Sequence, residues 1–383
     1  MNETASIGIS ATNPCHLYDL ARALHARAAL GAYHSGYPIW RLRPPARMNV
    51  RPHAWRTVIT YAWRRLPPRW RPMDHRLFRW QDEGFDRAVA QSLRAEDGGF
   101  IHALPGQARE TFLAARRLGK KTVLNHASGP TRLQQELVAG EYRRAGLAAE
   151  AHHGFDTAYR AREDAEYELA DFHCAASTVV REQLASLGVA RDRIWVVPYA
   201  ADPAVFGRPA PHAPRAPARI VFAGQLTLRK GLRVLFDAVD RLRRSLPVEL
   251  HLYGPAARDI ASDLAPRRAM PWIFLHGAVA QETLARAFHS ATVLALPSWE
   301  EAFGLVVPQA LNCGLPCVVS DRVGAADLIR PRRNGGIFPA GDAEALAREL
   351  AWWLEHADAF DSPLLTWDTP AEQMIAHTRH AAA

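Results

Sequence analysis

The sequence predicts an α/β protein made of two doubly wound domains that face each other across a central cleft. Short β-branched runs alternate with amphipathic helical stretches along the chain, which is the pattern of parallel sheets covered by helices on both faces. The chain has 383 residues, more than one hydrophobic core usually serves. A proline-rich stretch also divides it near the middle. Ligands of such domains bind outside the carboxyl ends of the strands, so we expect the cleft there.

Each half of the chain shows the alternation on its own. In the first half we expect strands at residues 5–10, 100–104 and 121–125, and helices at residues 17–28 and 109–118. In the second half we expect strands at residues 219–224, 248–253, 292–296 and 316–320, and helices at residues 232–242, 281–289 and 306–312. Each predicted strand is a short apolar run, and each predicted helix carries apolar residues at helical spacing.

The expected boundaries follow from the proline-rich stretch. It contains Pro203, Pro209, Pro211, Pro214 and Pro217 and few large apolar residues, as a linker does. We therefore expect a first domain at residues 1–202, a linker at 203–218, a second domain at 219–360 and a C-terminal helical segment at 361–383.

Composition and charge narrow the class of protein. Apolar residues make up 48% of the chain and charged residues 22%, as in a globular protein. No apolar run reaches the ~18 residues of a membrane span, and residues 1–10 lack the pattern of a secretory signal. The four scattered cysteines favour buried thiols in a reducing compartment over a metal site. We expect a cytoplasmic protein, and its net charge of +8 suits an anionic partner.

Residues 38–90 combine arginine and tryptophan. They hold twelve arginines, five of the eleven tryptophans and only four acids. This mixture suits a membrane surface or a lipid-linked acceptor, because indole rings lie at headgroup depth and guanidinium groups meet lipid phosphates. Nucleic acid would use the same residue types but is the less favoured partner. An ordinary arginine-rich surface is the remaining interpretation.

The run from Val221 to Gly231 reads Val-Phe-Ala-Gly-Gln-Leu-Thr-Leu-Arg-Lys-Gly. A predicted strand ends at Gly224, and Arg229 and Lys230 directly precede a predicted helix. Two cations beside free backbone N–H groups at a helix N-terminus form a site for a diphosphate. Taken alone, the run is equally compatible with a basic surface turn.

Residues 297–320 form a second run that carries groups able to bind a ligand. Glu300 and Glu301 follow a predicted strand, and Gly304 opens a turn into a predicted helix. A carboxylate can accept hydrogen bonds from sugar hydroxyls, and exposed amides can bind the charged groups of a donor. We expect Glu301 to act with the amides of three following residues, Phe303, Gly304 and Leu305.

In order and spacing, these runs resemble the family-four group of retaining GT-B glycosyltransferases (glycosyl transferases group 1). Their motif is two glutamates separated by seven residues, and its first position is Glu301. Supporting features are Gly-x-Leu-x-x-x-Lys-Gly at residues 224–231, Tyr-Gly-Pro at 253–255, Gly277, and the runs 323–329 and 334–339 followed by Asp342. The resemblance is close over residues 195–355 and looser before them. It implies two Rossmann-like domains, the first binding an acceptor and the second a sugar nucleotide, with the C-terminal segment packing back on the first.

Two positions depart from the family pattern. Gln309 stands in place of the second glutamate, which in the family typically holds the ribose of the nucleotide. A glutamine can still accept a hydroxyl hydrogen bond, although a neutral and weaker one. Gln225 stands where an arginine often follows the first glycine, and we expect Arg229 to supply the missing cation.

Histidines mark the strand ends of the first half. His102 and His126 both come at the carboxyl end of a predicted strand, so we expect them to face the cleft. The resemblance implies that His126 lies near the donor sugar and acceptor, whereas a structural histidine is the alternative for each. His16 ends the Asn-Pro-Cys-His run at 13–16, where the family usually has glycines. We assign His16 and His102 to acceptor or sugar contacts.

The sequence therefore predicts transfer of a sugar from a nucleotide-sugar donor to a glycan or lipid-linked acceptor in bacterial polysaccharide or glycolipid synthesis. The resemblance alone implies retention and gives catalytic roles to Lys230, Glu301 and His126. The chain has no Asp-x-Asp pair, so we expect no metal, and the nucleotide sugar is a substrate, so we expect no cofactor. The alternatives are an epimerase of the same fold and a catalytically silent sugar-nucleotide-binding protein. Through residues 38–90, the protein would lie at the inner face of the cell membrane.

Overall fold

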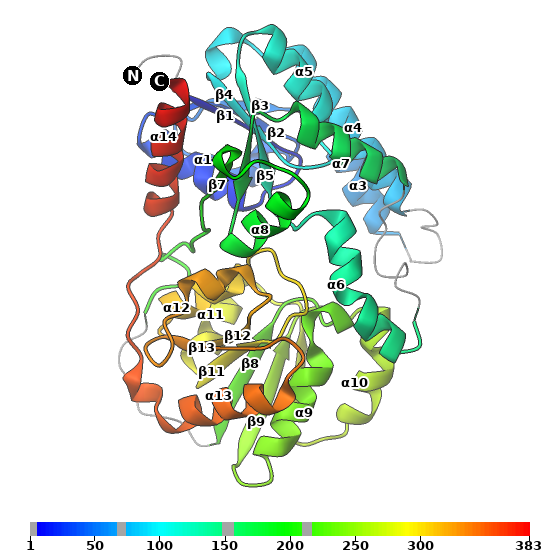
Figure 1. Ribbon diagram of the computed structural model, residues 1–383, viewed down its shortest axis with the longest axis vertical. Coiled ribbons are helices and arrows are strands. Elements are labelled where there is room, and N and C mark those ends of the chain that lie inside the picture. The colour runs from blue at the N-terminus through cyan, green and yellow to red at the C-terminus, as the bar shows by residue number, and fades with distance from the viewer. Residues whose placement is uncertain (1–5, 67–73, 148–156, 209–216) are drawn as a thin grey trace.

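The computed structural model describes residues 6–66, 74–147, 157–208 and 217–383, and these residues form two α/β domains (Figure 1). Each domain is built on one sheet whose neighbouring strands run parallel. The fold class predicted from the sequence is confirmed. Residues 209–216, which hold three of the expected linker prolines, lie outside the described residues.

The N-terminal sheet has seven strands among the described residues, in the order β3-β2-β1-β4-β5-β6-β7. The strands are β1 (Ile7–Ala11), β2 (Leu30–Ser35), β3 (Val50–Pro52), β4 (Phe100–Ala103), β5 (Lys121–His126), β6 (Phe172–Ala175) and β7 (Ile194–Val196). The helices are α1 (His16–Ala26), α2 (Ile39–Leu42), α3 (Trp55–Arg64), α4 (Asp74–Ser92), α5 (Arg109–Arg117), α6 (Thr131–Arg144), α7 (Thr157–Leu169) and α8 (Thr178–Ser186). All five residues of β1 are buried, as expected of a strand covered on both faces.

The C-terminal sheet has six strands in the part of the chain described, in the order β10-β9-β8-β11-β12-β13. The strands are β8 (Ala218–Ala223), β9 (Val248–Tyr253), β10 (Ile273–Gly277), β11 (Val293–Leu296), β12 (Cys317–Ser320) and β13 (Gly335–Phe338). The helices are α9 (Leu232–Leu242), α10 (Ala261–Arg267), α11 (Gln281–His289), α12 (Val306–Asn312), α13 (Ala343–Glu355) and α14 (Asp368–Ala382). The strand order reverses beside β8 and β11, which is where open α/β sheets bind ligands.

The last helix, α14, returns to the N-terminal domain and lies beside α1 (Figure 1). Its Ala371 and Met374 are buried in the same cluster as Leu17 of α1. Arg27, just after α1, forms ion pairs with Asp368 at 2.7 Å and with Glu372 at 3.1 Å. The chain therefore crosses between the domains twice, once after β7 and once before α14.

Helix α6 also spans the two domains (Figure 1). At its beginning, the hydroxyl of Thr131 donates to Glu163 of α7 at 3.2 Å. Farther along, Val138 and Tyr142 are buried in the C-terminal core. The hydroxyl of Tyr142 donates to Asp259 at 2.5 Å. This helix thus belongs to the first domain by its start and to the second by its packing.

Candidate active site

The loop between β8 and α9 carries the basic residues expected to bind a diphosphate. The segment Leu228–Lys230 forms one 3-10 turn, and Gly231 then adopts a left-handed conformation with φ of 69°. A Cβ on Gly231 would lie 1.9 Å from the carbonyl oxygen of Pro297, so only glycine permits this approach. The amide of Trp299 donates to the carbonyl of Arg229 at 2.9 Å. The loop is therefore held against the segment that follows β11.

This packing brings Lys230 and Glu301 together. Their side chains form an ion pair, with exposed fractions of only 10% and 18%. Burial is the main cause that lowers the pKa of Lys230, and the neighbouring Arg229 lowers it further. The carboxylate of Glu300 opposes both effects by favouring the charged ammonium. The two residues assigned to the donor phosphate and the donor sugar thus lie in contact.

Arg229 has a different partner. Its guanidinium donates to the carbonyl of Glu300 at 3.0 Å and to its carboxylate at 2.9 Å. Glu300 is buried, and the amide of Gln134 in α6 approaches its other carboxylate oxygen at 3.4 Å. We expected Arg229 to meet the donor in place of the arginine missing at Gln225. The structure pairs it with a buried carboxylate, which needs this charge to be stable.

The turn before α12 presents backbone donors next to Glu301. Among the described residues, the amides of Gly304 and Leu305 donate to no backbone or side-chain acceptor. Phe303 is buried, whereas 37% of Leu305 is exposed. Gln309 lies in the middle of α12 and is partly buried. The glycine at 224 ends β8 with φ of 146°. These residues flank Lys230 and Glu301 in the sequence, in the order that the motif predicts.

The side chains of the three predicted histidines, His16, His102 and His126, are all buried. His126 contacts His173 of β6, with 3.0 Å between Nε2 and Nδ1, and burial holds its pKa well below the ordinary value. Asn125 approaches His102 at 2.9 Å, and His16 stacks on Tyr199 at 4.0 Å. Burial lowers the pKa of both His16 and His102 to about 3.

A buried neutral imidazole cannot contact a substrate without a movement of the surrounding chain. The backbone carbonyl of His126 accepts from the hydroxyl of Tyr199 at 3.4 Å. The structure therefore brings Lys230, Glu301 and the turn at 303–305 together, and it keeps the histidine side chains out of that group.

Sequence reasoning missed two features of this site. It did not identify Glu300 as the buried partner of Arg229, although the adjacent carboxylates at 300 and 301 were visible. It also missed the approach of α6, because helical periodicity does not say which domain a helix covers. In the described part of the chain, no group of three or more His, Cys, Asp or Glu side chains lies together as metal ligands would.

Comparison with known proteins places the second half of the chain in a family. Residues 217–356 match the family model described as Glycosyl transferases group 1. A D-inositol 3-phosphate glycosyltransferase of Jonesia denitrificans is 32% identical over 196 residues, which cover 43% of this chain and 44% of the relative. A lipopolysaccharide 1,6-galactosyltransferase of Salmonella typhimurium is 27% identical over 180 residues, which cover 45% and 49%. The chain thus matches less than half the length of these relatives.

The fold comparison extends over both domains. The structure of HepE from Anabaena in complex with UDP aligns with a TM-score of 0.62 and 14% identity, covering 98% of this chain and 95% of that one. At this identity the likeness concerns the fold alone. Together with the loop geometry around Lys230 and Glu301, these findings show that residues 217–356 are a domain of the glycosyl transferases group 1 family, set within a GT-B fold.

Proposed function

We propose that this protein transfers a sugar from a nucleotide-sugar donor to a glycan or lipid-linked acceptor, with retention of configuration. The observation that carries the proposal is the contact between Lys230 and Glu301 at the carboxyl ends of β8 and β11, inside the family-matched domain. The relatives named above are glycosyltransferases, and HepE was solved with UDP. Synthesis of bacterial polysaccharide or glycolipid is the setting that these names suggest for this chain.

The proposed roles of the site residues follow from their charges and hydrogen-bonding groups. As the donor bond breaks, negative charge accumulates on the departing diphosphate, and Lys230 would stabilise it without a metal. Glu301 would accept hydrogen bonds from sugar hydroxyls, and the free amides of Gly304 and Leu305 would donate to the donor. Gln309 would contact the ribose. Arg229 would position the loop through Glu300, and His126 would act only after its ring became exposed.

Product analysis with a panel of donors tests this proposal. The panel contains UDP-, GDP- and ADP-linked hexoses, each with and without octyl glycosides as acceptors, in the presence of EDTA. We expect nucleotide release that accelerates with an acceptor and persists in EDTA. A new nucleotide sugar formed without acceptor would identify an epimerase. Donor binding without release or conversion would identify a silent binding protein, and loss of release in EDTA would contradict metal independence.

We also propose that residues 38–90 bring the enzyme to an anionic membrane or a lipid-linked acceptor. Trp55, Val58 and Ile59 recur at helical spacing on α3, and all three are exposed. Trp40 on α2 is 70% exposed. The guanidinium of Arg56 lies 4.1 Å from the ring centroid of Trp55. Residues 67–73, including Trp70, lie outside the described residues.

None of the described helices is long and apolar enough to cross a bilayer. Any membrane contact of these helices would therefore be interfacial. An amphipathic helix of this kind lies in the headgroup region with its apolar face inserted. Each basic residue near an anionic leaflet contributes about 1 kcal/mol of attraction. Exposed charges are screened beyond about 8–10 Å at physiological ionic strength, so this share should weaken as salt rises.

Co-sedimentation with vesicles measures this attraction. We expect the protein to bind phosphatidylglycerol-containing vesicles more than phosphatidylcholine vesicles, with binding reduced but not abolished by salt. The double variant Trp40→Ser/Ile59→Ser should lose the salt-resistant part. Leu364→Ser, at a residue that is 50% exposed outside the segment, is the control and should bind as the native chain does. Equal binding to both vesicle types would leave residues 38–90 as ordinary surface.

A further inference from the structure

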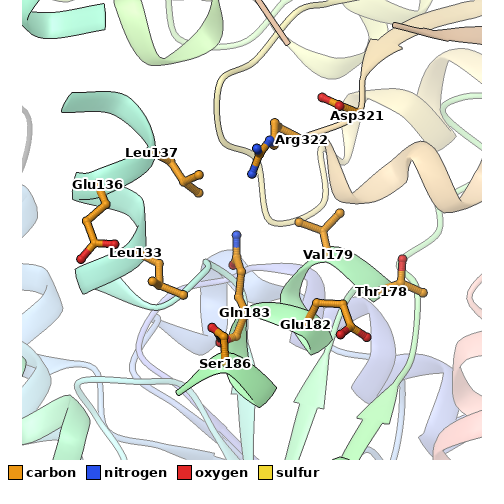
Figure 2. Close-up of a pocket in the computed structure, with 10 residues that line it drawn as sticks. All are labelled: Leu133, Glu136, Leu137, Thr178, Val179, Glu182, Gln183, Ser186, Asp321 and Arg322. Atoms are coloured by element: carbon orange, nitrogen blue, oxygen red, sulfur yellow. Dashed lines mark hydrogen bonds between the residues drawn. The ribbon is translucent and has the colours of Figure 1, made fainter. Parts of the chain in front are cut away.

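A pocket separate from the Lys230 loop lies between α6, α8 and the loop after β12 (Figure 2). Its volume is about 620 Å³, within the usual range of about 300–1,000 Å³ for small-molecule sites. Leu133 and Leu137 of α6 and Val179 of α8 form apolar walls, and Arg322 belongs to the loop of the other domain. The pocket is thus built by both domains.

The pocket adjoins the candidate active site through the backbone. The amide of Glu301 donates to the carbonyl of Arg322 at 3.2 Å, so a wall residue of the pocket is hydrogen-bonded to the residue assigned to the donor sugar. Gly129 connects the two sites from the other side. A Cβ at this position would lie 2.5 Å from Oε1 of Gln183 and 3.3 Å from Oε1 of Glu300. Gln183 of the pocket and Glu300 beside the Lys230 loop therefore both approach the same glycine.

Gln183 offers polar groups that have no partner. Its Oε1 is buried and accepts no hydrogen bond within the described structure. Figure 2 shows the amide of Gln183 rising between the leucines of α6 and Arg322. A buried polar atom without a hydrogen bond costs free energy unless a ligand or a water molecule forms a hydrogen bond with it. A small shift of this amide would let it exchange hydrogen bonds with a ligand in the pocket.

The charges of the wall indicate the class of ligand. The lining residues include three carboxylates, Glu136, Glu182 and Asp321, and one arginine, Arg322. Glu182 is already paired with Arg191, at 2.6 and 2.5 Å. An excess of carboxylates disfavours a phosphate and favours hydroxyl groups, which donate to carboxylates. Aliphatic walls with a few such groups suit the C–H faces and hydroxyls of an uncharged sugar ring.

We infer that this pocket, which we name the α6–α8 pocket, holds an uncharged sugar unit of the acceptor. The inference rests on the proposed transferase function and adds the acceptor's chemical class and place. Gln183 binds hydroxyls, Leu137 packs on the ring, and the shared Glu301–Arg322 backbone contact places this ring beside the donor sugar. A phosphate or lipid part of the acceptor stays outside the pocket.

Ligand-detected NMR tests the inference on the full chain. The probes are methyl glycosides of glucose, galactose, mannose and N-acetylglucosamine, with glucose 6-phosphate as the anionic comparison. Binding of UDP, GDP and ADP is recorded on the same samples. We expect at least one glycoside to give a saturation-transfer signal stronger than that of glucose 6-phosphate. Leu137→Trp should fill the pocket and reduce the glycoside signal about tenfold, a loss on the scale of ~1.4 kcal/mol.

Two controls separate this result from a general defect. Leu118→Trp alters a leucine that is 46% exposed at the end of α5, and it should keep the glycoside signal. Gln183→Ala removes the amide without adding bulk, and it should lower the signal even if Leu137→Trp fails to fold. Neither pocket variant should change the affinity for the nucleoside diphosphate.

The outcomes distinguish the two proposals. Nucleotide binding with a glycoside signal that neither pocket variant lowers would overturn the inference and leave the transferase proposal standing. A stronger signal from glucose 6-phosphate would overturn the assignment to an uncharged sugar. Absence of binding to every nucleoside diphosphate would instead overturn the transferase proposal.

Discussion

Replacing Lys230 with alanine should lower kcat/KM for transfer by about 10²-fold or more, because removal of one preorganised group that stabilises developing negative charge costs that much in other enzymes. The structure adds a second reason. Lys230 is the charged partner of Glu301, and both side chains are largely buried. The variant would leave a carboxylate without its cation at the site proposed for the donor diphosphate, so electrostatic repulsion would add to the lost attraction.

Steady-state kinetics with the best donor measures the effect. Lys121→Ala removes an exposed lysine at the start of β5, far along the strand from its carboxyl end, and should leave kcat/KM unchanged. A melting curve of each variant separates a lost charge from a lost fold. Unchanged turnover in a folded Lys230→Ala protein would place this loop outside the active site.

Substitution of Glu301 by alanine should nearly abolish transfer. This carboxylate is assigned to the donor hydroxyls, and it also holds the ammonium of Lys230 in place. Single-turnover kinetics with saturating donor should therefore show a loss in the chemical step, while the affinity for the nucleoside diphosphate alone changes little. Glu301→Gln keeps the size and the hydroxyl contact but not the charge, so it should retain more activity than Glu301→Ala.

Gln309→Glu is the matched variant at the other motif position. It restores the residue that the family carries, and a charged acceptor binds a ribose hydroxyl more strongly than a neutral one. We expect transfer to be kept or improved. Any improvement should appear as a lower KM for the donor. Complete loss of activity in Gln309→Glu would contradict the ribose assignment, and full activity in Glu301→Ala would contradict the assignment to the sugar.

The fold was predictable because its longer buried strands appear in the sequence as continuous apolar runs. Residues 248–253 and 219–224 were expected as strands and correspond to β9 (Val248–Tyr253) and β8 (Ala218–Ala223). The edge strand β3 was not expected, because Val50–Pro52 has three residues and ends in proline. Likewise β6 and β7 are short and interrupted by polar or aromatic residues. Such segments become strands only because a neighbouring strand is already in place.

The contact between Lys230 and Glu301 was predictable, because the position of each residue in its own loop decides it. The runs containing Lys230 and Glu301 each follow a strand, and the carboxyl ends of parallel strands meet at one edge. Partners from distant segments were not predictable. The pairing of Arg229 with Glu300 depends on how two loops pack, and the burial of His126 depends on His173 in a strand that begins at residue 172. Neither contact leaves a periodic signal in the sequence.

The anchoring of α6 at both ends constrains how the cleft can open. Its start is bonded to Glu163 of the first domain, and its Tyr142 is bonded to Asp259 of the second. Any rigid rotation that separates the two sheets must release one of these bonds or bend the helix between them. Tyr142 lies against Thr227, only three residues before Lys230. A rotation that opens the cleft would therefore also strain a contact of the loop that carries Lys230.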